Sequence, residues 1–149
     1  MNFKPIEILL AEDNPGDARL TLEGFKDAKI KNNITVVEDG KEALAYLHHE
    51  APYENSALPD LILLDLNMPK KGGREVLAEI KADAELRRIP VLVFTISNAE
   101  RDILEAYNLQ ANAFITKPID LNEFITVVKS MEAFWLTIVQ LPQSASYAQ

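Results

Sequence analysis

Short apolar runs alternate along this chain with longer stretches in which apolar residues recur every three or four positions. The apolar runs are uninterrupted and cover residues 8–11, 34–37, 61–64, 91–94 and 113–115. Such runs are typical of strands in a parallel sheet covered on both faces, whereas the longer period is that of a helix with one buried face. Five strand–helix units predict a single α/β domain with an open, doubly wound sheet.

Polar side chains closely follow four of the five apolar runs. Glu12 and Asp13 follow the first run, Asp65 the third and Thr95 the fourth, and Lys117 stands two positions after the fifth. In an open α/β sheet the carboxyl ends of the strands form the crevice in which ligands bind. We therefore expect these five side chains to lie close together.

Three carboxylates in one place require positive charge. Two carboxylates about 6 Å apart repel each other by roughly 3 kcal/mol at an effective dielectric constant of about 20. Lys117 supplies one positive charge, and Mg²⁺ suits the remaining oxygens because it binds one or two carboxylates together with water and phosphate. We therefore predict a Mg²⁺ site, in which Mn²⁺ could substitute.

A carboxylate beside a cation can act as a nucleophile toward a phosphoryl group and form an aspartyl phosphate. The protein's task in such a transfer is to position the phosphoryl group and neutralise its charge, which Lys117, the cation and the Thr95 hydroxyl would do. The sequence offers no second free acid–base group or Ser/His/Asp set beside Asp65. It therefore predicts that Asp65 is a phosphoacceptor.

The composition argues against several other classes of protein. A length of 149 residues corresponds to about one domain. The formal net charge of −8 disfavours partners such as nucleic acids and anionic membranes. The absence of cysteine excludes thiol catalysis and iron–sulfur clusters. Because no apolar segment is long enough for a signal peptide or a membrane span, we expect a soluble, cytoplasmic protein.

Five short motifs stand at the strand ends in a characteristic order. They are Glu12-Asp13, Asp65-Leu66-Asn67-Met68-Pro69, Gly73, Thr95 and Thr116-Lys117-Pro118. Together they resemble the signature of the receiver domains of response regulators, the phosphoacceptor proteins of two-component signalling. The resemblance implies a flavodoxin-like (βα)5 fold with strand order 2-1-3-4-5, in a receiver domain that occupies residues 1–131.

This resemblance implies how Asp65 is phosphorylated and how the metal is held. A partner histidine kinase would donate the phosphoryl group from its phosphohistidine to Asp65. Asp13, Asp65 and the backbone carbonyl of Asn67 would bind Mg²⁺, and Glu12 would act on the metal through water. The protein would assist its own phosphorylation and dephosphorylation but would not be an enzyme acting on a separate substrate.

The resemblance also implies a switch. Thr95 and Lys117 would bind the phosphoryl oxygens, and Phe114 would change its burial as Thr95 moves toward the phosphoryl group. Such coupling biases a two-state equilibrium that already exists. The Lys117–Pro118 peptide bond is expected to be cis by the same resemblance.

Residues 132–149 form an extension that a minimal receiver domain does not need. It is apolar to about residue 142 and includes Phe134 and Trp135, while the Ser- and Ala-rich residues from about 143 onward are expected to be disordered. An apolar surface of this extent is seldom left in water. We expect it to form a homodimer interface, with packing onto its own domain as the alternative.

Three segments carry a narrower resemblance, to single-domain regulators that partner cyanobacterial phytochrome kinases. They are residues 53–56, residues 73–81, and residues 134–136 followed by Leu141-Pro142. A phosphorylation-independent scaffold remains the main alternative function. A haloacid-dehalogenase phosphatase is disfavoured because Asn67 stands where that chemistry needs an acid, and a nucleotide- or flavin-binding domain because no Gly-rich loop follows the first strand.

Overall fold

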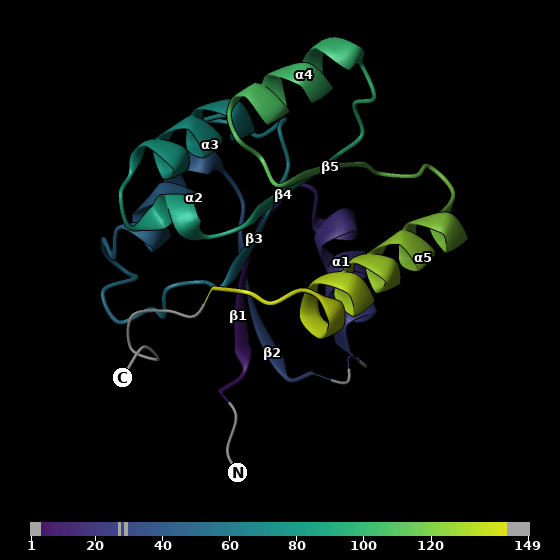
Figure 1. The fold of residues 1–149 in the computed structure, drawn as a ribbon, viewed down its shortest axis with the longest axis horizontal. Coiled ribbons are helices and arrows are strands. Elements are labelled where there is room, and N and C mark those ends of the chain that lie inside the picture. The colour runs from purple at the N-terminus through teal and green to yellow at the C-terminus, as the bar shows by residue number, and fades with distance from the viewer. Residues whose placement is uncertain (1–3, 27, 29, 143–149) are drawn as a thin grey trace.

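A single parallel sheet lies at the centre of the computed structural model, which describes residues 4–26, 28 and 30–142. Its strand order is β2-β1-β3-β4-β5 (Figure 1), as predicted for a flavodoxin-like domain. The strands are β1 (Ile6–Ala11), β2 (Asn32–Val37), β3 (Leu61–Leu64), β4 (Val91–Thr95) and β5 (Ala113–Thr116). The helices that alternate with them are α1 (Pro15–Lys26), α2 (Gly40–Leu47), α3 (Gly73–Ala82), α4 (Glu100–Asn108) and α5 (Leu121–Glu132), and the short 3-10 helix η1 (Leu86–Arg88) precedes β4.

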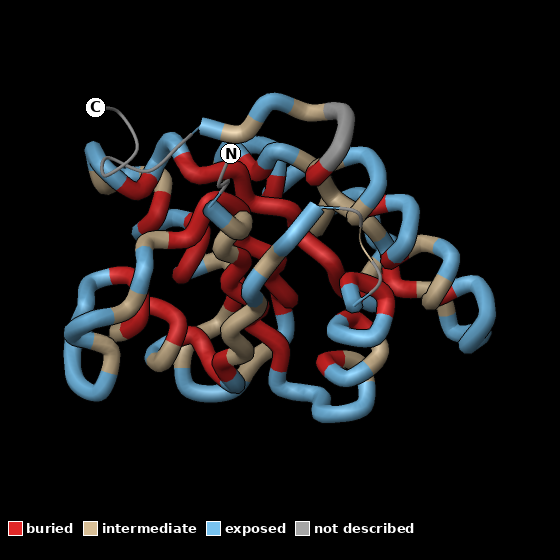
Figure 2. Tube along the Cα trace, turned by 90° about the horizontal axis from the view of Figure 1, so that it is seen from below, coloured by how far each residue is buried: buried red, intermediate tan, exposed pale blue. Residues whose placement is uncertain are grey.

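The helices form two layers on opposite faces of the sheet. Helices α1 and α5 cover one face, and α2, α3 and α4 cover the other (Figure 1). Each layer has its own buried cluster of apolar side chains, and the buried residues gather in the middle of the molecule (Figure 2). All four residues of β3 are fully buried, which explains why its sequence is uninterrupted rather than alternating.

Side-chain caps fix the beginnings of α1 and α5, the helices that follow β1 and β5. Asn14 caps α1, because its Oδ1 accepts a hydrogen bond from the backbone N–H of Asp17 at 3.0 Å, and Pro15 occupies the first helical position. Asp120 caps α5 in the same way, accepting from the N–H of Glu123 at 3.0 Å. These caps hold the loops after β1 and β5 at the carboxyl edge of the sheet.

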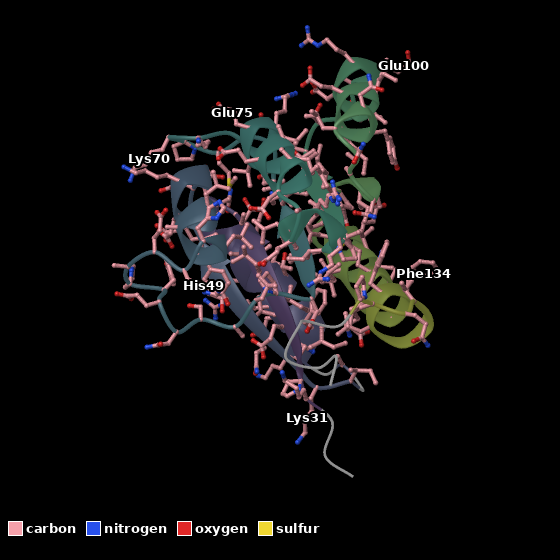
Figure 3. The ribbon with its side chains drawn as sticks, turned by 60° about the vertical axis from the view of Figure 1, so that its left-hand side comes forward. Lys31, His49, Lys70, Glu75, Glu100 and Phe134 are labelled. Atoms are coloured by element: carbon pink, nitrogen blue, oxygen red, sulfur yellow. The ribbon has the colours of Figure 1, made fainter. Side chains whose placement is uncertain are left out.

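The extension continues α5 as a π-helical turn, η2 (Ala133–Ile138). Trp135, Leu136 and Leu141 pack against the apolar cluster under α1 and α5, so part of the extension folds back onto its own domain. Phe134, labelled in Figure 3, is 49% exposed. Its ring contacts that of Trp135, with centroids 5.8 Å apart. The stretch expected to be disordered, 143–149, lies outside the described residues.

None of the helices in the described ranges is long and apolar enough to cross a bilayer.

Candidate functional site

The pairing of β1 with β3 brings Glu12 and Asp65 together. Ala11 and Leu64 are register partners in these neighbouring parallel strands, so the residues that follow them leave the sheet side by side. The backbone N–H of Asp65 donates to the carbonyl of Ala11 at 3.1 Å, which continues the ladder one step further. Two strands far apart in sequence therefore deliver their carboxylates to the same point.

Lys117 reaches this point from β5, on the far side of β4. Its backbone N–H donates to the carbonyl of Thr95 at 2.7 Å, and its side chain is only 3% exposed. The Nζ atom donates to Glu12 Oε1 at 2.5 Å, to Asp65 Oδ2 at 3.0 Å and to Asp17 Oδ2 at 2.9 Å. An ammonium group has three N–H bonds, so each has its own carboxylate acceptor.

The acidic side chains are grouped closely enough to hold a divalent cation. Oxygen atoms of Glu12, Asp13 and Asp65 lie within 4.8 Å of one another, and Asp13 is exposed while the other two are buried. A hard cation such as Mg²⁺ prefers such oxygen ligands and keeps several waters, which the exposed side would admit. Asn67 lies next to this group, since its backbone N–H donates to Asp65 Oδ1 at 3.2 Å.

Thr95 presents a hydroxyl with no partner. The residue is completely buried, and within the described part of the chain its Oγ1 makes no hydrogen bond. A buried hydroxyl without a partner costs roughly 1–3 kcal/mol, so native proteins seldom leave one. An anion bound at this edge of the sheet would give the Thr95 hydroxyl an acceptor.

Burial and charge set the protonation of the group. Burial raises the pKa of Glu12 to about 7, while the hydrogen bond from Lys117 limits the rise and the nearby Asp65 charge adds to it. Burial alone would lower the pKa of Lys117, but its hydrogen bonds to Glu12 and Asp17 raise that pKa above its ordinary value. Lys117 therefore stays charged at neutral pH, whereas Glu12 gains or loses its proton at a pH close to neutral.

The raised pKa of Glu12 predicts a pH-dependent stability. Between pH 4.5, the ordinary pKa of a glutamate, and about pH 7, the folded protein binds more protons than the unfolded chain. The free energy of unfolding of the metal-free protein should therefore fall as pH rises through this window, by on the order of 2–3 kcal/mol from this residue. Urea denaturation in EDTA at pH 5 and pH 7.5 measures the fall.

A Glu12→Gln variant is the control, because Gln keeps an oxygen acceptor for Lys117 but does not titrate. Burial also raises the pKa of Asp60, and this contribution cancels in the difference between the two proteins. In the variant, the free energy of unfolding should fall much less between pH 5 and pH 7.5 than in wild type. Parallel stability curves for wild type and variant would show that Glu12 does not titrate in this range.

Phe114, expected at the switch, lies on β5 beside β4. It is the register partner of Val93, and Thr116, two residues later, is the partner of Thr95. Its ring is half-buried against the apolar cluster under α2 and α3. Its backbone N–H donates to the hydroxyl of Tyr107 at 3.2 Å, which ties β5 to α4.

Two features of the site differ from the sequence-based expectations. The expectation of a cis Lys117–Pro118 bond is wrong for this structure, in which the cis bond among the described residues is Ala51–Pro52. The trans form is the lower in energy by about 0.5–1 kcal/mol for X–Pro bonds, and with it Lys117 already reaches its three carboxylates. Asp17, which no strand-end pattern indicates, also belongs to the site, and its only signal in the sequence is a carboxylate in the first turn of the helix after β1.

Known proteins resemble this chain over most of its length. Residues 8–129 match the family model of the response regulator receiver domain. The chain is 47% identical over 138 residues to the response regulator Rcp1 of Synechocystis sp., which covers 93% of this chain and 94% of that protein. It is 38% identical over 133 residues to the probable methanogenesis regulatory protein FilR2 of Methanothrix harundinacea, covering 89% and 84%.

Solved structures give the same result. The phosphorylated cyanobacterial phytochrome response regulator RcpA superposes with a TM-score of 0.91 at 48% identity, over 94% of this chain and all of that chain. The Mn²⁺-bound form of Rcp1 superposes with a TM-score of 0.91 at 47% identity, over 93% of this chain and all of that chain. The fold and the order of the elements are therefore those of both proteins.

Proposed function

This chain belongs to the response regulator receiver family, and on that premise we propose that Asp65 accepts a phosphoryl group from a partner histidine kinase in a Mg²⁺-dependent reaction. The observation that carries the proposal is the convergence of three carboxylates from β1 and β3 within 4.8 Å, with the ammonium of Lys117 bound 3.0 Å from Asp65. The phosphorylated protein would then signal through protein–protein contacts. We take residues 1–131 as the receiver domain and 132–149 as its extension.

The transfer would use the side chains in distinct ways. An Asp65 carboxylate oxygen attacks the phosphorus, the P–N bond to the kinase histidine breaks, and the imidazole leaves with the electron pair of that bond. Lys117 turns one N–H from Asp65 Oδ2 to a phosphoryl oxygen, and Thr95 donates its free hydroxyl to another. A bound Mg²⁺, held by Asp13, Asp65 and the carbonyl of Asn67, with Glu12 acting through water, would neutralise charge on the phosphoryl oxygens. Mn²⁺ would substitute, and its presence in the related Rcp1 structure supports this.

The test is incubation with labelled acetyl phosphate and Mg²⁺, comparing wild type with an Asp65→Ala variant. Wild type should acquire a hydroxylamine-labile label, as an acyl phosphate does, and EDTA should prevent labelling because the carboxylates then repel the incoming phosphate. A folded wild-type protein that takes up no label would favour the alternative of a phosphorylation-independent scaffold.

The loop between β4 and α4 would transmit the phosphorylation. Ser97 Oγ donates to Asp102 Oδ2 at 2.5 Å, and Arg74 on α3 pairs with both Asp102 and Glu105 on α4. These bonds hold the loop that follows Thr95 in one arrangement. Thr95 would move toward a phosphoryl group as the burial of Phe114 changes. This movement would strain the bonds made by Ser97 and Arg74 and so change the surface that α4 presents to a partner.

The partner kinase is proposed from the relatives. RcpA is a cyanobacterial phytochrome response regulator, and the similarity to it covers 94% of this chain. We infer that the kinase that phosphorylates Asp65 is of the phytochrome type. This agrees with the narrower resemblance in residues 53–56, 73–81, 134–136 and 141–142.

The exposed part of the extension supports a homodimer. A groove of about 270 Å³ between β5 and the last helix is lined largely by apolar side chains, and Phe134 stands exposed at its edge (Figure 3). The lining residues are Ile115, Val127, Ser130, Met131, Phe134 and Trp135. Because Trp135 also packs against the core of its own domain, Phe134 is the sharper probe of a contact between two copies.

A Phe134→Ala variant is expected to be monomeric where wild type is a dimer of twice 16.7 kDa, because the substitution removes an apolar anchor from the interface. Light scattering at several concentrations measures the mass. Leu22→Ala, which shortens a partly exposed side chain on α1, should leave the dimer intact. Equal masses for wild type and the Phe134 variant would refute this role of the extension.

A further inference from the structure

Asp17 holds Lys117 from outside the group of strand-end residues. It lies in the first turn of α1, and its carboxylate accepts a hydrogen bond from Lys117 Nζ at 2.9 Å, across 100 residues of sequence. Its side chain is 25% exposed, unlike the buried Glu12 and Asp65. The capping bond from Asp17 N–H to Asn14 fixes the backbone from which this carboxylate extends.

The three partners of Lys117 come from three different elements, and only one of them has to change during phosphoryl transfer. Asp65, after β3, is the group that reacts, so its contact with Nζ must give way to a phosphoryl oxygen. The contacts from Glu12, after β1, and from Asp17, on α1, have no such need to move. These two contacts fix the directions of two N–H bonds of the Lys117 ammonium. The direction of its third N–H bond is then fixed as well.

We propose that Asp17 is a positioning residue for the phosphoryl transfer, anchoring the ammonium of Lys117 so that its remaining N–H points to the place where the phosphoryl group forms. The inference rests on the proposed phosphorylation of Asp65. A lysine side chain has four rotatable bonds and much rotamer freedom, and a single buried partner restricts it less than two. Holding a group in the productive geometry is a large part of what a protein contributes to this chemistry.

Two simpler roles for Asp17 must be separated from this one. The oxygens grouped for a metal belong to Glu12, Asp13 and Asp65, so the grouping gives Asp17 no place as a ligand. A carboxylate in the first turn of a helix is also stabilising through the helix dipole, without any effect on Lys117. A test must therefore report on Lys117 itself as well as on the reaction.

The test compares wild type with Asp17→Ala, which removes both the oxygen acceptor and the charge, and with Asp17→Ser as a second variant compatible with the first turn of a helix. One measurement is the rate of label uptake from acetyl phosphate with Mg²⁺. The other is the ¹⁵N-resolved ammonium signal of Lys117 in the metal-free protein, assigned by its absence in Lys117→Met. Both Asp17 variants should lose roughly tenfold in rate, the scale of one charge-assisted hydrogen bond, and should lose the ammonium signal through faster exchange with water.

Glu23→Gln is the matched control, since it removes a carboxylate from the same helix and Glu23 makes no ion pair with Lys117. It should keep both the rate and the signal. A wild-type rate in the Asp17 variants overturns the inference while leaving the proposed function intact. A reduced rate with an unchanged ammonium signal also overturns it, because Lys117 would then be held as before. Absence of label on wild type would instead defeat the proposed function, and the inference with it.

Discussion

An Asp65→Ala variant is expected to take up no label from acetyl phosphate under conditions in which wild type is labelled to a plateau. Asp65 is the nucleophile in the proposed reaction, and its neighbours cannot replace it. Glu12 is buried and already hydrogen-bonded to Lys117, and Asp13 is exposed to water. The loss should be complete because no bond to phosphorus can form, in contrast to the partial loss that follows removal of a positioning contact.

The matched control for this variant is Asp60→Asn, because Asp60 precedes the same strand at its other end. Asp60 is buried and accepts a hydrogen bond from the N–H of Glu7 at 2.9 Å, a contact that the amide oxygen of Asn preserves. This variant should be labelled like wild type. Asp65→Asn, which is closer in shape than Ala, should be as inactive as Asp65→Ala. Label that survives in either Asp65 variant would mean that another residue is the phosphoacceptor.

A Gly73→Ala variant is expected to lose about 1–3 kcal/mol of unfolding free energy, the range for overpacking a well-packed site. Gly73 begins α3 and lies against the backbone that carries Asp65. An added Cβ would clash with the carbonyl oxygen of Asp65 and would come within 2.6 Å of the Cα of Leu66. Both are backbone atoms, so α3 or the segment that carries Asp65 and Leu66 must shift. Urea denaturation gives the stability, and the labelling assay should show a slower reaction from the displaced Asp65.

Gly72→Ala tests whether the steric clash is the cause. A Cβ at Gly72 would meet the carbonyl oxygen of Leu66 at 3.6 Å, an ordinary contact, and the backbone there is extended. The loss of chain entropy in the unfolded state favours this variant, whereas the poorer helix cap disfavours it, so its stability should stay within about 1 kcal/mol of wild type. If the two glycine variants were equally stable, close packing at Gly73 would not be the cause.

Most of the fold and the central part of the site follow from the sequence, for a definite physical reason. A strand buried on both faces must be apolar throughout, so the uninterrupted run at 61–64 predicts such a strand. The next residue, Asp65, must then lie at the carboxyl edge of the sheet. The same argument applies to Glu12, because the last four residues of β1 are buried. Strand β5 is only partly buried, so Lys117 is placed by the apolar run at 113–115 and the parallel topology alone. Parallel topology then brings the three together without any knowledge of side-chain positions.

Features that depend on how side chains meet could not be predicted in this way. Asp17 lies on a helix, where a carboxylate in the first turn is common for reasons unrelated to any site. Its contact with Lys117 depends on the path of a long side chain from β5, which no local pattern encodes. The isomer of the Lys117–Pro118 bond rests on a small energy difference that tertiary contacts decide, and the expectation of a cis bond there was wrong.

The unpaired hydroxyl of Thr95 has a consequence for the size of the response to phosphorylation. On the proposed switching role of Thr95, a conformation that leaves this group unsatisfied is higher in free energy by about 1–3 kcal/mol than one in which it is satisfied. A difference of that size changes the ratio of two conformers by roughly 5- to 150-fold. The acceptor that satisfies the hydroxyl is a phosphoryl oxygen, so this difference arises only when Asp65 carries the phosphoryl group. On this proposal the single hydroxyl of Thr95 would widen the difference in output between the resting and the phosphorylated protein.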